Sequence, residues 1–411
     1  MREYWKHAFC RPRRFIALWA ILFTISFAIN LVAHWPKPVM VRTEAVNVSF
    51  ALQRGEGFSN PFSTGPNGPT AHIAPLYPMF HAALCSIFGT GMAGGFAILA
   101  VTTLMWSLQC AMVRRFAGFY GRHRAGTIAA FLLVLAPLPK VLFRWEAAFT
   151  AAAIAGCACL IATILARRAG VASHALLGGL MAIGTLLNPA TILIWTAWAG
   201  LLVFKLGFRP FAKVLLPVAL VFAIPVGAWT VRNWVVFHHL IFVRDNLGLE
   251  LAASYNDCAL TVMSPVFSST CYTPFHPNDD LDVERVLIAM GEFQFSARCR
   301  DQAIAWIRAH PAQSVAITAG HYFYFWFPVE RAGPDALILG IIISIVTLLS
   351  FPGISWRHND GFQIAMTAML SYSAIYLLFR SVPRYRYPVL WVSVLLATIG
   401  IETWLARRKS R

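Results

Sequence analysis

Apolar runs of about 20 residues recur along this chain, and they limit its possible folds more than any other feature. Runs of that length can cross a bilayer core of about 30 Å as helices. The runs are continuous rather than alternating, so they predict helices and not barrel strands, the only other spanning structure that lipid tolerates. Only 12% of the 411 residues are charged, which is too few to cover a soluble domain. We therefore predict an all-α polytopic membrane protein.

We predict about ten membrane-spanning helices, and an even number, because basic loops alternate along the chain. The predicted spans cover 15–35, 91–112, 124–142, 147–166, 174–187, 190–204, 211–230, 335–351, 361–379 and 387–405. They give an N-terminal bundle over 1–230 that includes a first outer loop over 36–90, a large outer segment over 231–334, and C-terminal spans over 335–411.

The charges sort between the two sides of this predicted bundle. Alternate loops and both chain ends carry 19 of the 34 Lys and Arg residues but only three of the 17 Asp and Glu residues. Basic loops favour the cytoplasm, so we predict that both termini are cytoplasmic and that the acid-rich side faces outward. We expect a bacterial inner-membrane protein with an active site facing the periplasm. The scattered basic residues orient the helices and do not indicate nucleic-acid binding.

Two outer segments are too long to be simple connectors. In the first, Thr43 to Arg54 has the pattern of a short amphipathic helix, Gly55 to Pro69 that of a loop, and Pro75 to Phe88 that of a helix along the membrane surface. In the second, Asp280 to His310 has apolar residues at helical spacing. We expect juxtamembrane helices in the first segment and a mixed structure in the second.

Two glutamates in the first outer loop are candidates for catalysis. Glu44 is expected at a helix start, where the helix N-terminus favours a negative charge. It could act as general base for an acceptor hydroxyl or amine, or it could only stabilise the helix. Glu56 lies between two glycines, where it is either a solvated turn residue or part of the site.

A very short outer hairpin before the fourth span carries Lys140, Arg144 and Glu146. An ionisable residue at the mouth of a helix bundle is a functional candidate, so Glu146 is a second possible catalytic residue. The alternative is an interfacial ion pair between Arg144 and Glu146. Either Lys140 or Arg144 could meet a phosphate group.

Several arginines stand at outer helix ends, against the usual distribution of positive charge. Arg232 follows the seventh span, and Arg380, Arg384 and Arg386 follow the ninth. Guanidinium groups bind phosphate oxygens in a fixed fork, so these residues predict a site for a lipid phosphate or pyrophosphate. The alternative is anchoring to lipid headgroups, with the neighbouring tyrosines in an aromatic belt.

The histidines and cysteines leave two questions open. His72, His81, His276 and His321 fall on the outer side, but none forms a ligand pair at metal-site spacing. No cofactor is therefore predicted, although a divalent metal bound by residues from distant loops stays an alternative. A disulfide between Cys258 and Cys271 suits an oxidising compartment, while a third outer thiol, Cys299, leaves the pairing open.

A set of short motifs shares its order and spacing with one family: Glu44, Gly55-Glu56-Gly57-Phe58, Ala74-Pro75-Leu76-Tyr77-Pro78, Trp229 to Asn233, His276-Pro277, Gly291-Glu292, Trp306 to Pro311 and Arg384 to Pro388. Together they resemble the GT-C superfamily of membrane glycosyltransferases, in the bacterial branch with protein O-mannosyltransferases and aminoarabinose lipid A transferases. The likeness covers about residues 40 to 390. One departure is Thr43-Glu44, where many members carry an Asp-Glu pair.

This resemblance implies a GT-C-like fold and a polyprenyl-phosphate sugar donor held in the membrane. It implies transfer with inversion to a lipid, glycan or protein acceptor. In this hypothesis Glu44 is the base, and Arg232, Arg384 and Arg386 stabilise the leaving phosphate. Tyr77, Glu56 and His72 are further candidates for substrate binding.

Two other classes of function stay open from the sequence. One is a transporter or a flippase of lipid-linked glycans, and the other is a noncatalytic subunit for envelope assembly. A transporter is expected to carry ionisable residues near the bilayer midplane, and the predicted spans have none at their centres. The long outer segments favour an enzyme.

Overall fold

The computed structural model describes residues 12–34, 42–62, 66–261, 276–278, 280–328 and 334–409. Over these ranges the regular structure is helical, and no β-strand occurs. The α-helices are α2 (Pro12–His34), α3 (Glu44–Gln53), α4 (Leu76–Phe88), α5 (Met92–Phe119), α6 (His123–Leu135), α7 (Ala147–Leu165), α8 (Val171–Leu187), α9 (Thr191–Leu206), α10 (Phe208–Phe237), α11 (Leu247–Ser254), α12 (Asp257–Thr261), α14 (Leu281–Met290), α15 (Glu292–Ala309), α16 (Pro311–Trp326), α17 (Pro334–Ser350), α18 (Asp360–Ser373) and α19 (Tyr387–Lys409). The 3-10 helices are η1 (Lys140–Phe143), η3 (Phe351–Trp356), η4 (Ala374–Leu377) and η5 (Pro383–Arg386).

A helix lies over each of the ten predicted spans. Six of the described helices are long and apolar enough to cross a membrane: α2, α5, α7, α10, α17 with η3, and η5 with α19. The described chain is therefore all-α, with several helices that could span a membrane, as the apolar runs predicted. The helices α6, α8, α9 and α18, of 13, 17, 16 and 14 residues, are shorter, and ten crossings stay a prediction.

The structure corrects the ends of two predicted spans. The third was expected to run to residue 142, but α6 ends at Leu135. Pro137 and Pro139 follow, and proline lacks the N–H that a continuing helix needs. The seventh was expected to end at residue 230, but α10 continues to Phe237. The expected division between bundle and outer segment at residue 230 therefore falls inside one helix.

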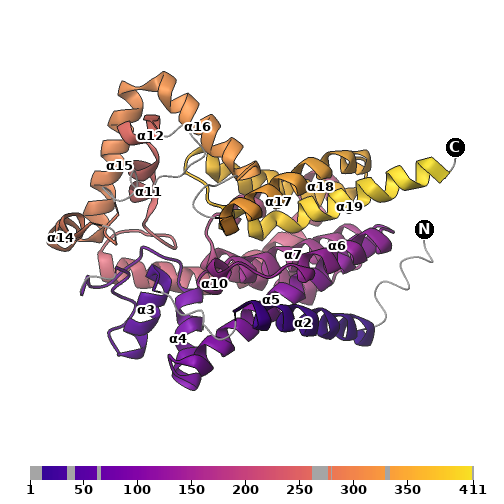
Figure 1. Ribbon diagram of the computed structural model, residues 1–411, viewed down its shortest axis with the longest axis horizontal. Coiled ribbons are helices and arrows are strands. Elements are labelled where there is room, and N and C mark those ends of the chain that lie inside the picture. Colours follow the sequence, from indigo (N-terminus) through magenta and orange to yellow (C-terminus); the bar gives the residue numbers. More distant parts are fainter. Residues whose placement is uncertain are drawn as a thin grey trace.

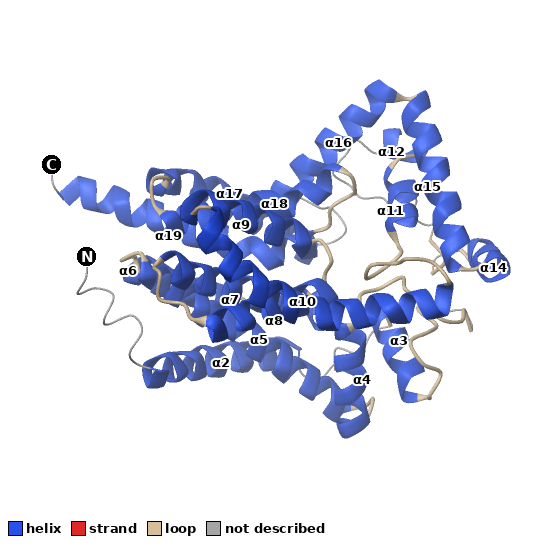
Figure 2. Ribbon diagram, turned by 180° about the vertical axis from the view of Figure 1, so that it is seen from behind, coloured by secondary structure: helices blue, strands red, loops and turns tan. Residues whose placement is uncertain are grey.

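The helices of the two outer segments gather at one end of the bundle (Figures 1 and 2). There, α3 and α4 lie on one side, and α11, α12, α14, α15 and α16 lie on the other. The start of α2 and the end of α19 both lie at the opposite end of the bundle (Figure 1). Within the bundle, α2 packs on α5, and α19 contacts α5, α6, α7 and α17. This arrangement brings both outer segments to the place where the bundle helices end.

Small residues bring several bundle helices close together. Alanine makes up much of α7, and nearly all of this helix is buried. Gly178 of α8 faces the backbone of Val218 in α10, so that an added Cβ would lie 2.4 Å from the Val218 carbonyl oxygen. In lipid, helix association depends on such close packing, because the surrounding chains are as apolar as the helices.

Both helices expected in the first outer loop are confirmed. The Thr43 hydroxyl caps α3 by accepting a hydrogen bond from the N–H of Val46 (3.4 Å). Glu44 is therefore the first residue of α3, at the end of the helix that favours a negative charge. The second of these helices is α4, and its Ile87 and Phe88 side chains are exposed. Its position along the membrane surface stays a prediction.

The second outer segment contributes helices and loops to the described structure. Gly291 separates α14 from α15, and its φ of 83° lies in the left-handed region that glycine adopts at little cost. Glu292 therefore begins α15.

Cys258 is disulfide-bonded, whereas Cys299 is a free and buried thiol. This excludes Cys299 from the expected pairing, and Cys271 lies outside the described residues.

Candidate active site

A cavity of about 1460 Å³ lies where the outer segments meet the bundle. Its walls come from the end of α2, from α3, from the loop between α6 and α7, from the segments before α11 and α14, and from α17, η5 and α19. Ligand pockets usually enclose roughly 300–1,000 Å³. This cavity is therefore large enough for more than one small substrate, or for a substrate with part of a lipid chain.

Glu44 faces this cavity from the first turn of α3. The side-chain amide of Asn278 donates a hydrogen bond to its Oε1 (2.9 Å), and Nε2 of His276 lies 3.4 Å from the same oxygen. The Glu44 side chain is 15% exposed to solvent. Burial raises the pKa of this carboxyl above its usual value, although the charge of Arg384 and the bond from Asn278 act against the rise. A carboxyl with a raised pKa is better suited to accept a proton near neutral pH.

Glu44, His72 and His276 form a group whose candidate ligand atoms all lie within 4.8 Å of one another. Tetrahedral ligands at about 2.0–2.1 Å from a zinc ion stand about 3.3 Å apart, which is close to the 3.4 Å between Glu44 and His276. Burial, with the charges of His276 and Arg244, lowers the pKa of His72 well below its usual value. Its imidazole is therefore neutral, the form that binds metals. These residues fit a divalent ion, whereas His81 and His321 lie outside the group.

The cavity carries more positive than negative side chains. Its basic lining residues are Arg42, Lys140, Arg144, Arg244, Arg380 and Arg384, and its acidic ones are Glu44 and Glu250. Like charges that share a cavity repel one another, so an anionic ligand lowers the energy of such a site. The lining therefore favours a ligand with phosphate or carboxylate groups.

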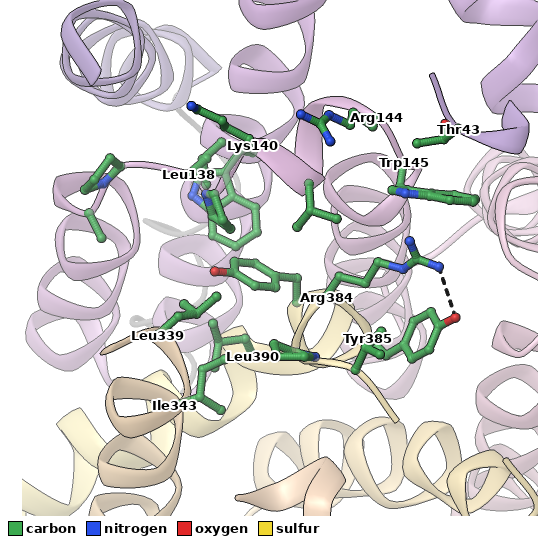
Figure 3. Close-up of a pocket in the computed structure, with 18 of the residues that line it drawn as sticks. Thr43, Leu138, Lys140, Arg144, Trp145, Leu339, Ile343, Arg384, Tyr385 and Leu390 are labelled. Atoms are coloured by element: carbon green, nitrogen blue, oxygen red, sulfur yellow. Dashed lines mark hydrogen bonds between the residues drawn. The ribbon is translucent and has the colours of Figure 1, made fainter. Parts of the chain in front are cut away.

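Arg384 is held in place by two aromatic residues. Its guanidinium lies over the Trp145 ring, 4.0 Å from the ring centroid, and donates a hydrogen bond to the Tyr385 hydroxyl (3.1 Å). Figure 3 shows this pair beside Arg144 and Lys140, which come from the loop between α6 and α7. Three cations from two distant parts of the sequence thus line the same cavity.

The cavity also has an apolar limb. Leu132 and Leu133 of α6 line it on one side and Ile338, Leu339, Ile342 and Ile343 of α17 on the other, with Leu390 and Val394 of α19. Both α6 and α17 pack on α19. Figure 3 shows Leu339, Ile343 and Leu390 together, away from Arg144 and Trp145. The limb lies among bundle helices, where the chain of a lipid could enter.

Arg386 does not line the cavity, contrary to its predicted part in a phosphate site. It is buried, with 1% exposure, and donates a hydrogen bond to the Ser393 hydroxyl (2.6 Å). Its guanidinium lies over the rings of Trp326 and Phe325, at 4.6 and 5.1 Å. In a 3-10 turn, residues two apart point about 120° away from each other, which separates Arg386 from Arg384.

Arg232 and Tyr77 also lie outside the cavity lining. Arg232 donates hydrogen bonds to the carbonyl oxygens of Thr70 (2.8 Å) and Phe58 (3.0 Å). The Tyr77 hydroxyl donates to the Phe143 carbonyl oxygen (2.7 Å). Both side chains therefore support the walls of the site through backbone carbonyls, and neither presents its polar group to a ligand in the cavity.

The other two glutamates that the sequence predicted as site residues differ from Glu44. Glu56 is exposed and forms an ion pair with Arg54 (2.5 Å), beside a smaller cavity of about 580 Å³. Glu146 is half-buried and accepts a hydrogen bond from Asn188 (3.4 Å). Neither lines the main cavity, whereas Lys140, Arg144, His72, Glu44 and Arg384 all do.

Sequence reasoning missed several lining residues, among them Arg42, Arg244 and Asn278. The backbone places Arg244, because its neighbour Val243 accepts a hydrogen bond from Trp229 Nε1 (2.9 Å). On the other side, the N–H of Asp245 donates to the Ala71 carbonyl oxygen (2.8 Å). For Arg244 and Asn278, the only sign in the sequence was that each lies among polar residues of the second outer segment.

No protein-family model matches this chain, and no curated protein was found to match it. Its function is therefore inferred from the chemistry that the cavity can support.

Proposed function

We propose that this protein is an integral-membrane glycosyltransferase of the GT-C type. It moves a sugar from a polyprenyl-phosphate donor to a lipid, glycan or protein acceptor at the outer face of the bacterial inner membrane. The observation that carries the proposal is a single cavity that joins a carboxylate, a group of cations and an apolar limb among the bundle helices. A lipid-linked sugar has the matching parts: an apolar chain, an anionic phosphate and a polar reacting group.

In the proposed arrangement, the donor lies with its prenyl chain among the bundle helices and its sugar toward the outer segments. Its prenyl chain would occupy the limb between α6 and α17, and its phosphate would meet Lys140, Arg144 and Arg384. The sugar would then extend toward Glu44. Guanidinium groups suit the phosphate because they offer paired donors in a fixed plane.

The proposed reaction is a single displacement with inversion at the anomeric carbon. The acceptor oxygen or nitrogen forms a bond to that carbon while the bond from the carbon to the phosphate oxygen breaks. Oε2 of Glu44 takes the acceptor proton, because Oε1 faces His276 and Asn278. The phosphate leaves with the bonding electron pair. Arg384 and its neighbouring cations stabilise the charge that develops on the phosphate.

A divalent ion held by Glu44, His72 and His276 would supply positive charge beside the acceptor and favour its deprotonation. The three residues offer the carboxylate and imidazole ligands that zinc and similar ions accept. This is the ion that the sequence left as an alternative, and we include it in the proposed site.

We also propose the predicted topology of ten crossings with both termini in the cytoplasm. Two observations support it: α2 begins and α19 ends at the same end of the bundle, and both outer segments gather at the other end. An odd number of crossings would separate the two ends of the chain.

The decisive experiment compares Glu44→Gln with Glu56→Gln in the full-length protein reconstituted in lipid nanodiscs. A membrane extract of cells that lack this chain supplies both the lipid-linked sugar donor and the acceptor, and the readout is release of polyprenyl phosphate. We expect Glu44→Gln to lower the rate about 100-fold or more, the range for loss of a general base. Glu56→Gln should keep most of the activity, because Glu56 lies outside the cavity. Full activity of Glu44→Gln would remove Glu44 from the reaction, and no release by the wild-type protein would favour a transporter or an assembly subunit.

A further inference from the structure

The segment that carries His72 is held by contacts from distant parts of the chain. Arg232 of α10 donates to the Thr70 carbonyl oxygen, and Asp245 N–H donates to the Ala71 carbonyl oxygen (both 2.8 Å). Thr70 and Ala71 are fully buried. His72 therefore extends from a piece of backbone that has little freedom to move.

The third contact comes from Glu292, the first residue of α15. Its Oε2 accepts a hydrogen bond from the Thr70 hydroxyl (2.5 Å), and its Oε1 accepts one from the Ala71 N–H (2.6 Å). The Thr70 hydroxyl oxygen in turn accepts a hydrogen bond from the His72 N–H (2.9 Å). The two carboxylate oxygens thus fix the residue before His72 directly, and fix His72 itself through one hydroxyl.

Placing Glu292 at this point has an energetic cost. The pKa of its carboxyl is raised to about 7, chiefly by burial, and the nearby Asp245 acts in the same direction. The bonds from Thr70 and Ala71 and the charge of Arg232 act against the rise. Removing a carboxylate from water is unfavourable unless its hydrogen bonds are satisfied, so these two contacts account for its position.

We propose that Glu292 is a positioning residue that sets the His72 imidazole beside Glu44 and His276. The inference depends on the metal site included in the proposed function. Residues behind metal ligands fix the orientation of those ligands, and their loss typically weakens metal binding by about 10–100-fold. Glu292 acts on His72 through the backbone. Because Glu292 belongs to the second outer segment, that segment also helps to assemble the site.

The chain offers a matched control for this proposal. Glu284 of α14 is also a buried glutamate of the outer segment that bonds to the first outer loop, in this case through the Asn67 side-chain amide. Its partner lies several residues before His72. Glu284→Ala therefore removes a similar contact between the two outer segments without touching the Thr70–His72 segment.

The experiment measures zinc affinity of the full-length protein in nanodiscs, by competition with a chromophoric chelator. We expect Glu292→Ala to weaken zinc binding about 10-fold or more, and Glu292→Gln to recover part of it, because the amide oxygen can still accept from Ala71 N–H. Thr70→Val, which removes only the hydroxyl, should weaken binding in the same direction. Thr70→Val also tests the proposal if the Glu292→Ala protein does not fold. Glu284→Ala should bind zinc as the wild-type protein does.

His72→Ala separates the failure of this inference from the failure of the metal site. If His72→Ala weakens zinc binding while Glu292→Ala and Thr70→Val do not, Glu292 does not position the ligand. An equal loss in Glu284→Ala and Glu292→Ala would also overturn the inference, because it would point to docking of the outer segment in general. If His72→Ala binds zinc normally, the metal site itself is wrong, and the inference is wrong with it. The role of Glu44 in transfer is decided separately, by polyprenyl phosphate release.

Discussion

At the scale of single residues, Arg384 and Arg386 have different environments although only Tyr385 separates them. Arg384 lines the cavity, and Arg386 is buried between Trp326, Phe325 and Ser393. The sequence predicted the location of the arginine cluster at an outer helix end. It could not separate the two residues, because their directions depend on the 3-10 turn that precedes α19.

This difference predicts separable effects of two substitutions. Arg384→Gln should lower transfer about 100-fold or more, because loss of one preorganised donor to a developing charge costs about 3–4 kcal/mol. Arg386→Gln should leave the transfer rate of the folded protein unchanged and act on the thermal unfolding midpoint instead. Both are measured on the purified protein with donor titrations and a melting curve. Equal effects of the two variants on the transfer rate would contradict the assigned positions.

The group of Glu44, His72 and His276 shows where residue-level prediction ends. Each residue was a candidate from its side-chain chemistry and its place in an outer segment. Their meeting depends on the docking of the second outer segment onto the first, through Asn278 on Glu44 and Glu292 on Thr70. No local pattern encodes such a contact, so the sequence left the metal as an alternative.

At the scale of elements, apolar length predicted where helices lie better than where they end. The apolar signal of the third span continued past Leu135, but two prolines end α6 there. The same residue type did not break α10, which contains Pro217 and Pro225. Neighbouring helices can compensate for proline inside a membrane helix, and a sequence alone does not show which neighbours are present.

The crossing of α8 and α10 gives a test at this scale. Gly178→Ala would place a methyl group against the Val218 backbone, at 2.4 Å from its oxygen, so the two helices must move apart. We expect a loss of stability of about 1–3 kcal/mol, the usual range for overpacking. Gly179→Ala is the matched control, because its Cβ would make only an ordinary contact of 3.8 Å with Val221. Thermal unfolding in detergent measures both, and an equal midpoint for the two variants would contradict the close packing at Gly178.

At the scale of the whole molecule, the sorted charges predicted that both outer segments would come together away from the chain ends, and the described helices have this arrangement. The cavity itself was beyond prediction from the sequence. Its apolar limb depends on α6 and α17 flanking α19, and its cations come from four separate parts of the chain. Periodicity describes the faces of single helices, whereas a cavity depends on how several helices pack together.

The most direct test of the central claim is the content of lipid-linked sugars in cells, measured by mass spectrometry. Cells that lack this chain are compared with cells that carry the wild-type protein, Glu44→Gln or Glu56→Gln at equal abundance in the membrane. We predict that one polyprenyl-phosphate sugar accumulates without the protein and with Glu44→Gln, and returns to its normal level with the wild-type protein and Glu56→Gln. A normal level of every lipid-linked sugar in the Glu44→Gln cells would contradict the proposed transferase.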